Sequence, residues 1–288
     1  MRIKSFAKIN LGLEVIGKRS DGYHEIKTLF QSVTLHDVLN FRALPDARIE
    51  LLGTDPNLSW GEDNLIHRAA KLLAQRHASR KGVAVRVIKR IPVGKGLGGG
   101  SSNAAMTLWA LNRLWQLGLD NGQLKELGGA LGSDVPFFLE GGLCLGTGRG
   151  EVVKPLPDLP SHACLLLFPH LAASTEHIYR HHRVSLTSHG KESRIMQFLE
   201  SPNLDGLTNE LEATVFRFYP LIKENKRRLH DWRPDLAAVS GSGSAVFGLF
   251  RSKGQARRAQ RALRDECRVR LVETISRERY WQSIGAGV

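Results

Sequence analysis

Apolar and polar residues alternate in several stretches of the chain, which predicts β-strands. Residues 5–15 turn their apolar side chains to one face of an extended chain and place Lys8 and Asn10 together on the other. A second strand-like stretch covers residues 26–41, and the turn dipeptide Asp21-Gly22 stands between the two, so residues 5–41 are predicted to form a hairpin. Further strands are predicted at residues 83–91, 163–168 and 269–275, and on both sides of a glycine turn at 240–243.

Other segments repeat their apolar residues every three or four positions, as helices do. Such helices are predicted after residue 65, over 104–115, 123–131 and 211–229, from Ser174 or Thr175 onward, and in a basic segment after residue 250. Pro136 disfavours a helical Val135, which places Asp134 on a turn between two elements. The polar tract 180–194 is typical of a loop or an insertion.

The order of these elements indicates an α+β protein. Strands and helices alternate without the regular rhythm of a parallel barrel, so we expect two lobes with a cleft between them. A length of 288 residues suits one large domain or two ordinary ones. Glycines between residues 141 and 150 surround a short predicted strand, and the prolines at 155–160 then favour a boundary, which predicts domains at residues 1–157 and 158–288.

A glycine-rich loop stands between the strand at 83–91 and the helix at 104–115. It carries five glycines in seven positions, followed by two serines and an asparagine. Glycines let backbone N–H groups approach an anion closely, and the start of a helix adds unpaired N–H groups and a positive dipole end. The loop is therefore interpreted as a phosphate cradle.

Three other kinds of glycine-rich segment have a similar composition. Gly94-x-Gly96-x-x-Gly99 satisfies the dinucleotide fingerprint, but a second helical segment follows where that fold needs a strand ending in an acidic residue. A Walker loop is excluded because no Gly-Lys pair precedes a Ser or Thr at the required spacing. A flexible linker is disfavoured because the loop sits tightly between a strand and an alanine-rich helix.

Composition narrows the class of protein. The chain is 42% hydrophobic and 24% charged, as globular proteins are. Its longest apolar run is too short to span a bilayer, and a strand pattern begins almost at residue 1, so neither a membrane span nor a signal peptide is expected. The three cysteines, Cys144, Cys164 and Cys267, are isolated from one another, which predicts free thiols, no metal site and a cytoplasmic location.

The net charge of +13 is concentrated toward the C-terminus, where residues 251–288 hold 10 Lys or Arg against 4 Asp or Glu. A nucleic-acid surface would explain it, but no aromatic residues are interleaved with the basic ones. Arg257, Arg258, Arg261 and Arg264 recur at helical spacing, which is typical of a solvated helix face. Long-range attraction of anionic substrates is the third explanation.

Four polar residues outside the loop are candidates for chemistry, and each also has a structural explanation. Lys8 could be a charge that protects an edge strand, and Asp134 could cap a helix. Tyr23 and His24 follow a turn, where side chains meet ligands but are more often plain surface. Read one at a time, these residues do not identify a site.

Read together, they resemble one family. The strings Lys8-Ile-Asn10, Arg19-Ser-Asp-Gly-Tyr-His24, residues 92–105, Gly132-Ser-Asp-Val-Pro136 and the late Ser-Gly-Ser-Gly turn occur in one order over nearly the whole chain. This order resembles the GHMP kinase superfamily. The resemblance implies a two-lobed fold, with an N-terminal domain like ribosomal protein S5, a ferredoxin-like C-terminal domain and the active site in the cleft between them.

The resemblance also implies a reaction. The γ-phosphoryl group of ATP, held with Mg²⁺, would pass to the 2-hydroxyl of a cytidyl-diphosphate-linked methylerythritol in the non-mevalonate route to isoprenoids. Asp134 would take the hydroxyl proton, and Lys8 would stabilise the alkoxide and keep Asp134 ionised. The residues expected to hold ATP are Pro92, Val93, Gly94, Lys95, Gly96, Leu97, Gly98, Gly99, Gly100, Ser101, Ser102 and Asn103. No protein side chain is assigned to the metal.

For the second substrate, the resemblance assigns the cytosine to His24 and stacking on the base to Tyr23 and Tyr179, with Asn10 and Thr175 near the sugar alcohol and diphosphate. Asn64 is expected near the ATP nucleoside. The chain departs from the family pattern at Glu176, Ser242 and Lys95, and Lys95 is expected to add charge beside the triphosphate.

The partner expected from this resemblance is a small molecule, with no nucleic acid and no membrane, and the protein is expected to be a monomer or a weak homodimer. Another small-alcohol kinase of the superfamily, acting on homoserine or mevalonate, is the alternative enzyme. A basic RNA-binding α+β module is the alternative outside enzymes, but it leaves the glycine loop unexplained.

Overall fold

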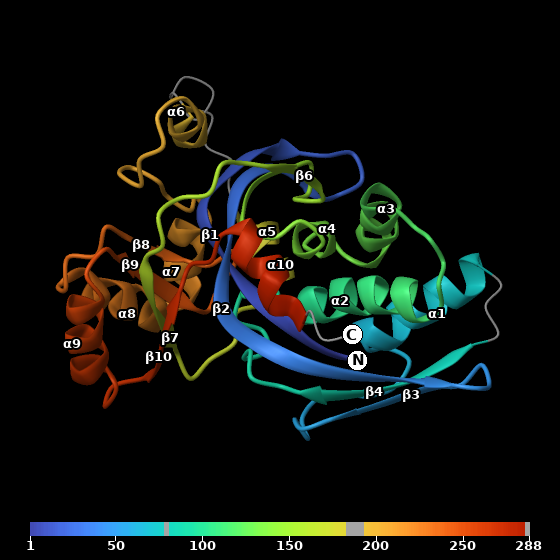
Figure 1. The fold of residues 1–288 in the computed structure, drawn as a ribbon. Helices are drawn as coiled ribbons and strands as arrows, with labels where there is room; N and C mark the ends of the chain where they lie inside the picture. The colour runs from blue at the N-terminus through green and yellow to red at the C-terminus, as the bar shows by residue number, and fades with distance from the viewer. Residues whose placement is uncertain (78–80, 183–192, 286–288) are drawn as a thin grey trace.

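The computed structural model describes residues 1–77, 81–182 and 193–285, and within them it has an α+β architecture built on two sheets (Figure 1). The strands are β1 (Arg2–Lys18), β2 (His24–Leu44), β3 (Ile49–Gly53), β4 (Gly82–Ile88), β5 (Leu143–Thr147), β6 (Val152–Pro155), β7 (Ala163–Phe168), β8 (Leu236–Val239), β9 (Val246–Phe250) and β10 (Arg268–Glu273). The helices are α1 (Leu65–Arg76), α2 (Gly99–Leu114), α3 (Asn121–Leu131), α4 (Val135–Phe138), α5 (Thr175–His181), α6 (Arg194–Glu200), α7 (Glu212–Phe218), α8 (Pro220–His230), α9 (Lys253–Leu263) and α10 (Arg277–Gly285). The predicted α+β class is confirmed.

The predicted hairpin is confirmed by the antiparallel pairing of β1 with β2. Register shifts at three points along the pair mark bulges, which bend a strand and increase its twist. β1 therefore curves through the whole molecule, and its successive side chains enter three separate hydrophobic clusters. Both of its faces are buried from Ser5 to Val15, so its polar residues lie inside the protein.

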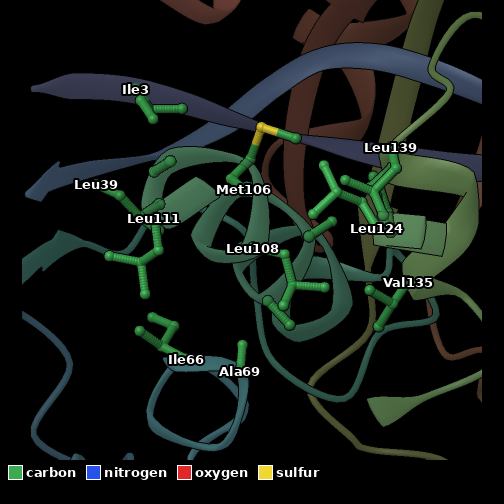
Figure 2. Packing of buried hydrophobic residues seen from close by; sticks show 14 of the residues in the cluster. Ile3, Leu39, Ile66, Ala69, Met106, Leu108, Leu111, Leu124, Val135 and Leu139 are labelled. Carbon is green, nitrogen blue, oxygen red and sulfur yellow. The ribbon is translucent and has the colours of Figure 1, made fainter. Parts of the chain in front are cut away.

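The first sheet has the strand order β3-β4-β2-β5-β6, with β1 paired to β2. Helices α1 to α4 pack together on it, and α2 is at the centre of that layer (Figure 1). Figure 2 shows Met106, Leu108 and Leu111 of α2 surrounded by apolar residues from β1, β2, α1, α3 and α4. A helix buried on most of its surface cannot shift easily, so the loop at its N-terminus has a rigid base.

The second sheet is antiparallel, in the order β10-β7-β9-β8. All six residues of β7 are buried, because the strand has a hydrophobic cluster on each face. Cys164, Leu166 and Phe168 join the cluster that contains the middle of β1, while Leu165 and Leu167 pack toward α7, α8 and α9. The apolar run that the sequence placed in a buried strand is thus explained by burial on both sides.

Several details differ from the sequence expectations. Val135 is helical, because Pro136 lies in the first turn of α4, where its missing N–H has no helical partner to lose. The predicted helix 211–229 is two helices, α7 and α8, which meet at Tyr219 with Pro220 opening the second. The short strands β3 and β6 and the helices α6 and α10 were not predicted.

Other expectations can be compared with the described residues only in part. The polar tract 180–194 lies mostly outside them. On α9 the basic residues are exposed while Ala256, Ala259 and Leu263 are buried, which confirms a solvated helix face. All three cysteines are free and buried. In the described ranges, no helix is both long and apolar enough to cross a membrane.

The C-terminal helix α10 returns from the second sheet and packs on the first one (Figure 1). Its Tyr280 is fully buried and donates a hydrogen bond to the carbonyl of Phe138 at 2.7 Å. The division at 157 and 158 stays a prediction, and α10 packs across that division.

Candidate active site

The glycine loop leaves β4 and enters α2 through a series of left-handed residues. Gly94, Gly96 and Gly98 have φ values of 66°, 74° and 67°, which residues with a side chain rarely adopt. α2 begins at Gly99, and Gly98 caps it without a side-chain hydrogen bond. The N–H groups of its first turn therefore have no side-chain acceptor at the cap, which leaves them for a ligand.

A cavity of about 420 Å³ lies against these N–H groups. It is lined by residues 92–101 and Asn103 and, on its other side, by the segment that leads into α1. Asn64 lines it too, but its side chain is used locally, accepting from the N–H of Ile66 and donating to the carbonyl of Ser59. Its size and its donors fit a nucleotide.

The loop is fixed by the second glycine turn, at residues 240–245. Ser240 donates to the carbonyl of Gly96 at 2.8 Å, and the N–H of Ala245 donates to that of Lys95 at 3.1 Å. A Cβ on Gly96 would lie 2.0 Å from the carbonyl oxygen of Ser240. The two turns are packed too closely for any side chain at position 96.

Lys95 does not direct its ammonium group into the loop. Nζ donates to the carbonyls of Pro169 and Leu171, which belong to the second lobe. Burial lowers the pKa of this ammonium group. Lys95 therefore links the two lobes by hydrogen bonds, whereas the sequence predicts that its charge lies beside the triphosphate.

A buried ion pair holds the segment before the loop, and it was missed in the sequence. Asp37 is fully buried and accepts from Lys89 Nζ at 2.7 Å and from the N–H groups of Arg90 and Ile91 at 2.7 and 2.8 Å. Lys89 Nζ also donates to the carbonyl of Ile91 at 2.6 Å. No local pattern marks Asp37, because its partners lie in the segment after β4, about 50 residues further along the chain.

Lys8 and Asp134 meet at the other side of the loop. Lys8 Nζ lies 3.5 Å from Asp134 Oδ2 and donates to Asn10 Oδ1 at 2.6 Å. Asn10 is oriented in turn by a hydrogen bond to Thr28. The Lys8 ammonium is also 5.4 Å from the centre of the Phe30 ring, which adds a cation–π contact.

The structural explanations for these two residues do not hold. Lys8 is only 3% exposed, so it is not a solvated charge guarding an edge. Asp134 stands at the N-cap of α4 but makes no capping hydrogen bond with its side chain, which is 33% exposed. The carboxylate is therefore open to a ligand on one side and held by an ammonium group on the other.

A larger cavity, of about 1020 Å³, extends from Lys8 and Asp134 toward the turn between β1 and β2. The predicted substrate residues Asn10, Tyr23, His24, Thr175 and Tyr179 all line it. The rings of His24 and Tyr179 lie 5.3 Å apart, centre to centre, whereas Tyr23 is 55% exposed at the rim. The structure thus brings the predicted substrate residues into one cavity.

Burial shifts the pKa values of two side chains that line this cavity, His24 and Tyr179. It lowers the pKa of His24, with the charge of Lys18 adding to the effect, so the imidazole is biased to its neutral form. Burial and then the charge of Asp134 raise the pKa of the Tyr179 hydroxyl, which stays protonated. Neutral rings and a hydrogen-bonding imidazole suit an uncharged aromatic ligand such as a nucleobase.

Sequence reasoning missed other residues that line this cavity. Arg149 stacks its guanidinium 4.8 Å from the centre of the Tyr23 ring, and His182 lies at the same end. Ser242, one of the departures from the family pattern, shares a hydrogen bond of 2.7 Å with Thr175, so its hydroxyl is in use. Glu176 is exposed and pairs with Arg180, one turn along α5.

The two cavities adjoin each other, because some residues line both of them. Gly96, Gly98 and Ser101 line both of them, while Lys8 and Asp134 line the larger one beside that shared wall. Among the described residues no group of three or more His, Cys, Asp or Glu could hold a metal ion. A magnesium ion here would depend on phosphate oxygens and water, with the Ser101 hydroxyl nearby.

Comparisons with known proteins point in one direction. Residues 64–142 match the family model for the GHMP kinases N terminal domain, and residues 189–269 match that for the GHMP kinases C terminal region. The 4-diphosphocytidyl-2-C-methyl-D-erythritol kinase of Thermodesulfovibrio yellowstonii is 43% identical over 265 residues, covering 89% of this chain and 92% of its own length.

Solved structures agree with these matches. A crystal structure of 4-(cytidine 5'-diphospho)-2C-methyl-D-erythritol kinase superposes with a TM-score of 0.82 at 38% identity, over 95% of this chain and 99% of the other. Homoserine kinase from Cytophaga hutchinsonii superposes with a TM-score of 0.74 at 18% identity, over 96% of this chain and 95% of its own, which shows a shared fold alone. The fold expected from the sequence resemblance is confirmed.

Proposed function

The chain belongs to the GHMP kinase family, and on this premise we propose that it transfers the γ-phosphoryl group of ATP to the 2-hydroxyl of 4-diphosphocytidyl-2-C-methyl-D-erythritol. It is a phosphotransferase that acts on an alcohol, in the non-mevalonate route to isopentenyl diphosphate. A cytoplasmic location and a monomeric or weakly dimeric state remain predictions.

One observation carries the proposal: the lysine–aspartate pair lies where the two cavities share a wall. A phosphate donor on the glycine loop and an alcohol in the larger cavity would meet at that wall. Phosphoryl transfer needs mainly positioning and charge neutralisation, so a rigid loop beside a single acid–base pair is sufficient machinery.

Asp134 would accept the proton of the attacking hydroxyl. Its carboxylate is partly exposed to the cavity, where it can reach a bound hydroxyl, and the Lys8 ammonium lies 3.5 Å from its Oδ2. Lys8 is fixed by Asn10 and by Phe30, so its charge is in place before the alkoxide develops, and no reorganisation is needed.

The glycine loop would hold the triphosphate. The N–H groups of the first turn of α2 and the positive end of its dipole face the 420 Å³ cavity. Mg²⁺ bound to the triphosphate would neutralise part of the charge that develops on its oxygens.

The cytidyl part would lie between Tyr23 and Tyr179, with the edge of the base at His24. Support comes from the shared cavity and from the neutral state that burial favours at His24. Homoserine and mevalonate carry no nucleobase, so a kinase for either would leave this end of a 1020 Å³ cavity unused.

An acceptor assay tests the proposal. The purified protein is given Mg-ATP with the cytidyl substrate, homoserine or mevalonate, and phosphorylated product is followed by ³¹P NMR. We expect turnover with the cytidyl substrate alone and its loss in Asp134→Asn. Turnover of homoserine or mevalonate without turnover of the cytidyl compound would show that the acceptor is wrong while the kinase assignment stands.

A further inference from the structure

A third cavity, of about 540 Å³, lies between the two sheets and is not part of the site described above. Its lining consists of residues 34–36 of β2, residues 89–92 at the start of the glycine loop, Asp55, and Arg268 and residues 270–272 of β10. It shares Lys89 and Pro92 with the nucleotide cavity and no residue with the substrate cavity.

The cavity exists because two strand edges diverge. Along one edge β2 pairs with β5 up to Gln31 and with β4 from Val38 onward, which leaves the stretch between them without a strand partner on that side. The edge strand β10 approaches this stretch only at its end, where the N–H of Glu273 donates to Thr34 and Val33 bridges Thr274. Toward Arg268 the edges separate, and residues 34–36 form the floor of the gap.

The lining carries positive charge that is not balanced by any residue in the part of the chain that the structure describes. Arg90, Arg268 and Arg270 line the cavity, and their side chains make no ion pair or hydrogen bond with any residue in the described ranges. Lys89 is already neutralised by Asp37, and Asp55 is the one carboxylate among the described lining residues.

Arginines without an ion pair also occur elsewhere in the described residues, for example Arg257 and Arg261 on α9, but Arg90, Arg268 and Arg270 differ in that they line one concave site. Three guanidinium groups around a concave site with one carboxylate create a local potential that attracts anions. Guanidinium groups bind phosphate oxygens in a bidentate manner, so phosphate is the anion that they fit best.

We propose that this cavity is a second anion site, which binds a small molecule with two or more phosphate groups. Three arginines exceed what one phosphate needs, and the volume is within the range of small-ligand pockets. Leu35, Ile91 and Leu271 add apolar walls, so the ligand can carry a hydrocarbon part. A single-stranded nucleic acid would need aromatic stacking platforms, and His36 is the one aromatic residue in the described lining.

Binding is tested with inorganic pyrophosphate as the probe. The enzyme is first saturated with a non-hydrolysable ATP analogue, which occupies the nucleotide cavity, and pyrophosphate is then titrated by calorimetry. We expect one site per chain. The double variant R268A/R270A should weaken it by about tenfold or more, because two charge-assisted contacts are lost.

The matched control is R257A/R261A on the exposed face of α9, which removes the same charge from the same lobe but not from the cavity. It should change the affinity by less than about twofold, since exposed charges at a distance are screened. Thermal unfolding without pyrophosphate, with equal midpoints for both variants and the parent, shows that neither variant is misfolded.

His36 offers a second readout in the whole protein. Burial lowers the pKa of its imidazole, and the positive charges of Lys4 and Arg90 lower it further, against the opposing effects of Asp37 and the carbonyl of Thr34. An anion in the cavity should raise that pKa, which ¹H–¹⁵N NMR can follow, with Arg90→Ala reducing the response.

Three results would overturn the proposal: no pyrophosphate binding to the analogue-saturated enzyme, equal affinity in R268A/R270A and the control, or an unmoved His36 pKa. Tighter binding of a single-stranded RNA than of pyrophosphate, lost in both double variants, would identify a nucleic-acid surface in its place.

Discussion

The buried pair of Asp37 and Lys89 permits a quantitative prediction about the glycine loop. Its carboxylate and ammonium side chains are 0% and 7% exposed, and together they make four contacts: one to each other, one to the carbonyl of Ile91, and one to each of the N–H groups of Arg90 and Ile91. Asp37→Asn keeps an acceptor for those N–H groups but leaves the Lys89 charge buried without a counter-charge.

Breaking one side of a buried pair costs about 3–5 kcal/mol, because the remaining charge has lost its solvation and its partner. We expect Asp37→Asn to lower the free energy of unfolding by about 3 kcal/mol, toward the low end of that range, because part of the hydrogen bonding survives. The apparent KM for ATP should rise as well, since the segment leads directly into the loop.

Urea unfolding followed by circular dichroism measures the first effect, and a coupled kinase assay measures the second. Lys89→Met and the double variant complete a mutant cycle. The double variant should cost clearly less than the sum of the two single ones, because it leaves no buried charge unpaired. Asp46→Asn, which breaks an exposed pair with Arg48, is the control and should change the free energy of unfolding very little, because water screens exposed charges.

The reasoning is refuted if Asp37→Asn costs no more than this control, or if the two single effects are simply additive. A large loss of stability with an unchanged KM for ATP would refute only the link from the pair to the loop.

Four further predictions follow from the site and its packing. Lys8→Met should reduce kcat by about a hundredfold or more with a small change in KM, because its charge is needed as the alkoxide forms; near-native kcat would remove Lys8 from the chemistry. Tyr179→Ala and Tyr23→Ala should raise the KM for the cytidyl substrate while kcat is largely kept, and Tyr179, the more buried ring, should have the larger effect; equal KM values in both variants and the parent would contradict stacking. Gly96→Ala should lower stability and raise the KM for ATP, because its Cβ has no room beside Ser240, whereas Gly129→Ala on α3, where nothing lies within 4 Å, should be neutral or slightly stabilising; thermal melts distinguish the two. Burial lowers the pKa of His24, His36 and His182 below 6.5, so the unfolded chain binds more protons, and stability should fall as the pH drops below about 6.5 toward the folded-state pKa values; unfolding free energies that stay level from about pH 7.5 to 5.5 would be inconsistent with this burial.

The functional residues are of two kinds: those that a local pattern places and those that only distant contacts bring together. Lys8 and Asn10 were placed on one strand face by simple alternation, and the structure joins them by a hydrogen bond. Their relation to Asp134 came from the family resemblance, because periodicity carries no information about which turn will reach a strand far away in the chain. Asp37 was missed for the same reason: its partners are residues 89–91, which follow β4 and are distant from β2 in the sequence.

The partners of the Lys95 ammonium group could not be inferred from the local sequence. A lysine inside a phosphate loop suggests a charge for the triphosphate, and only the docking of the second lobe reveals two carbonyls that take up its ammonium group. The position of Tyr280 also depends on tertiary contacts. It belongs to α10, far along the chain from the first lobe, yet it is fully buried in the core of that lobe.

By itself, the sequence determined what short-range forces control. These are the hairpin, the buried strand at 163–168, the helices with a clear apolar period, and a loop whose glycines alone can adopt left-handed φ. The tertiary structure decided what depends on contacts between distant segments. It placed Lys8 against Asp134, held the segment before the loop through Asp37, turned Lys95 to the other lobe and brought three arginines, unpaired among the described residues, around one cavity. Charge and hydrogen-bond partners act through space, so their pairing becomes defined only when the chain has folded.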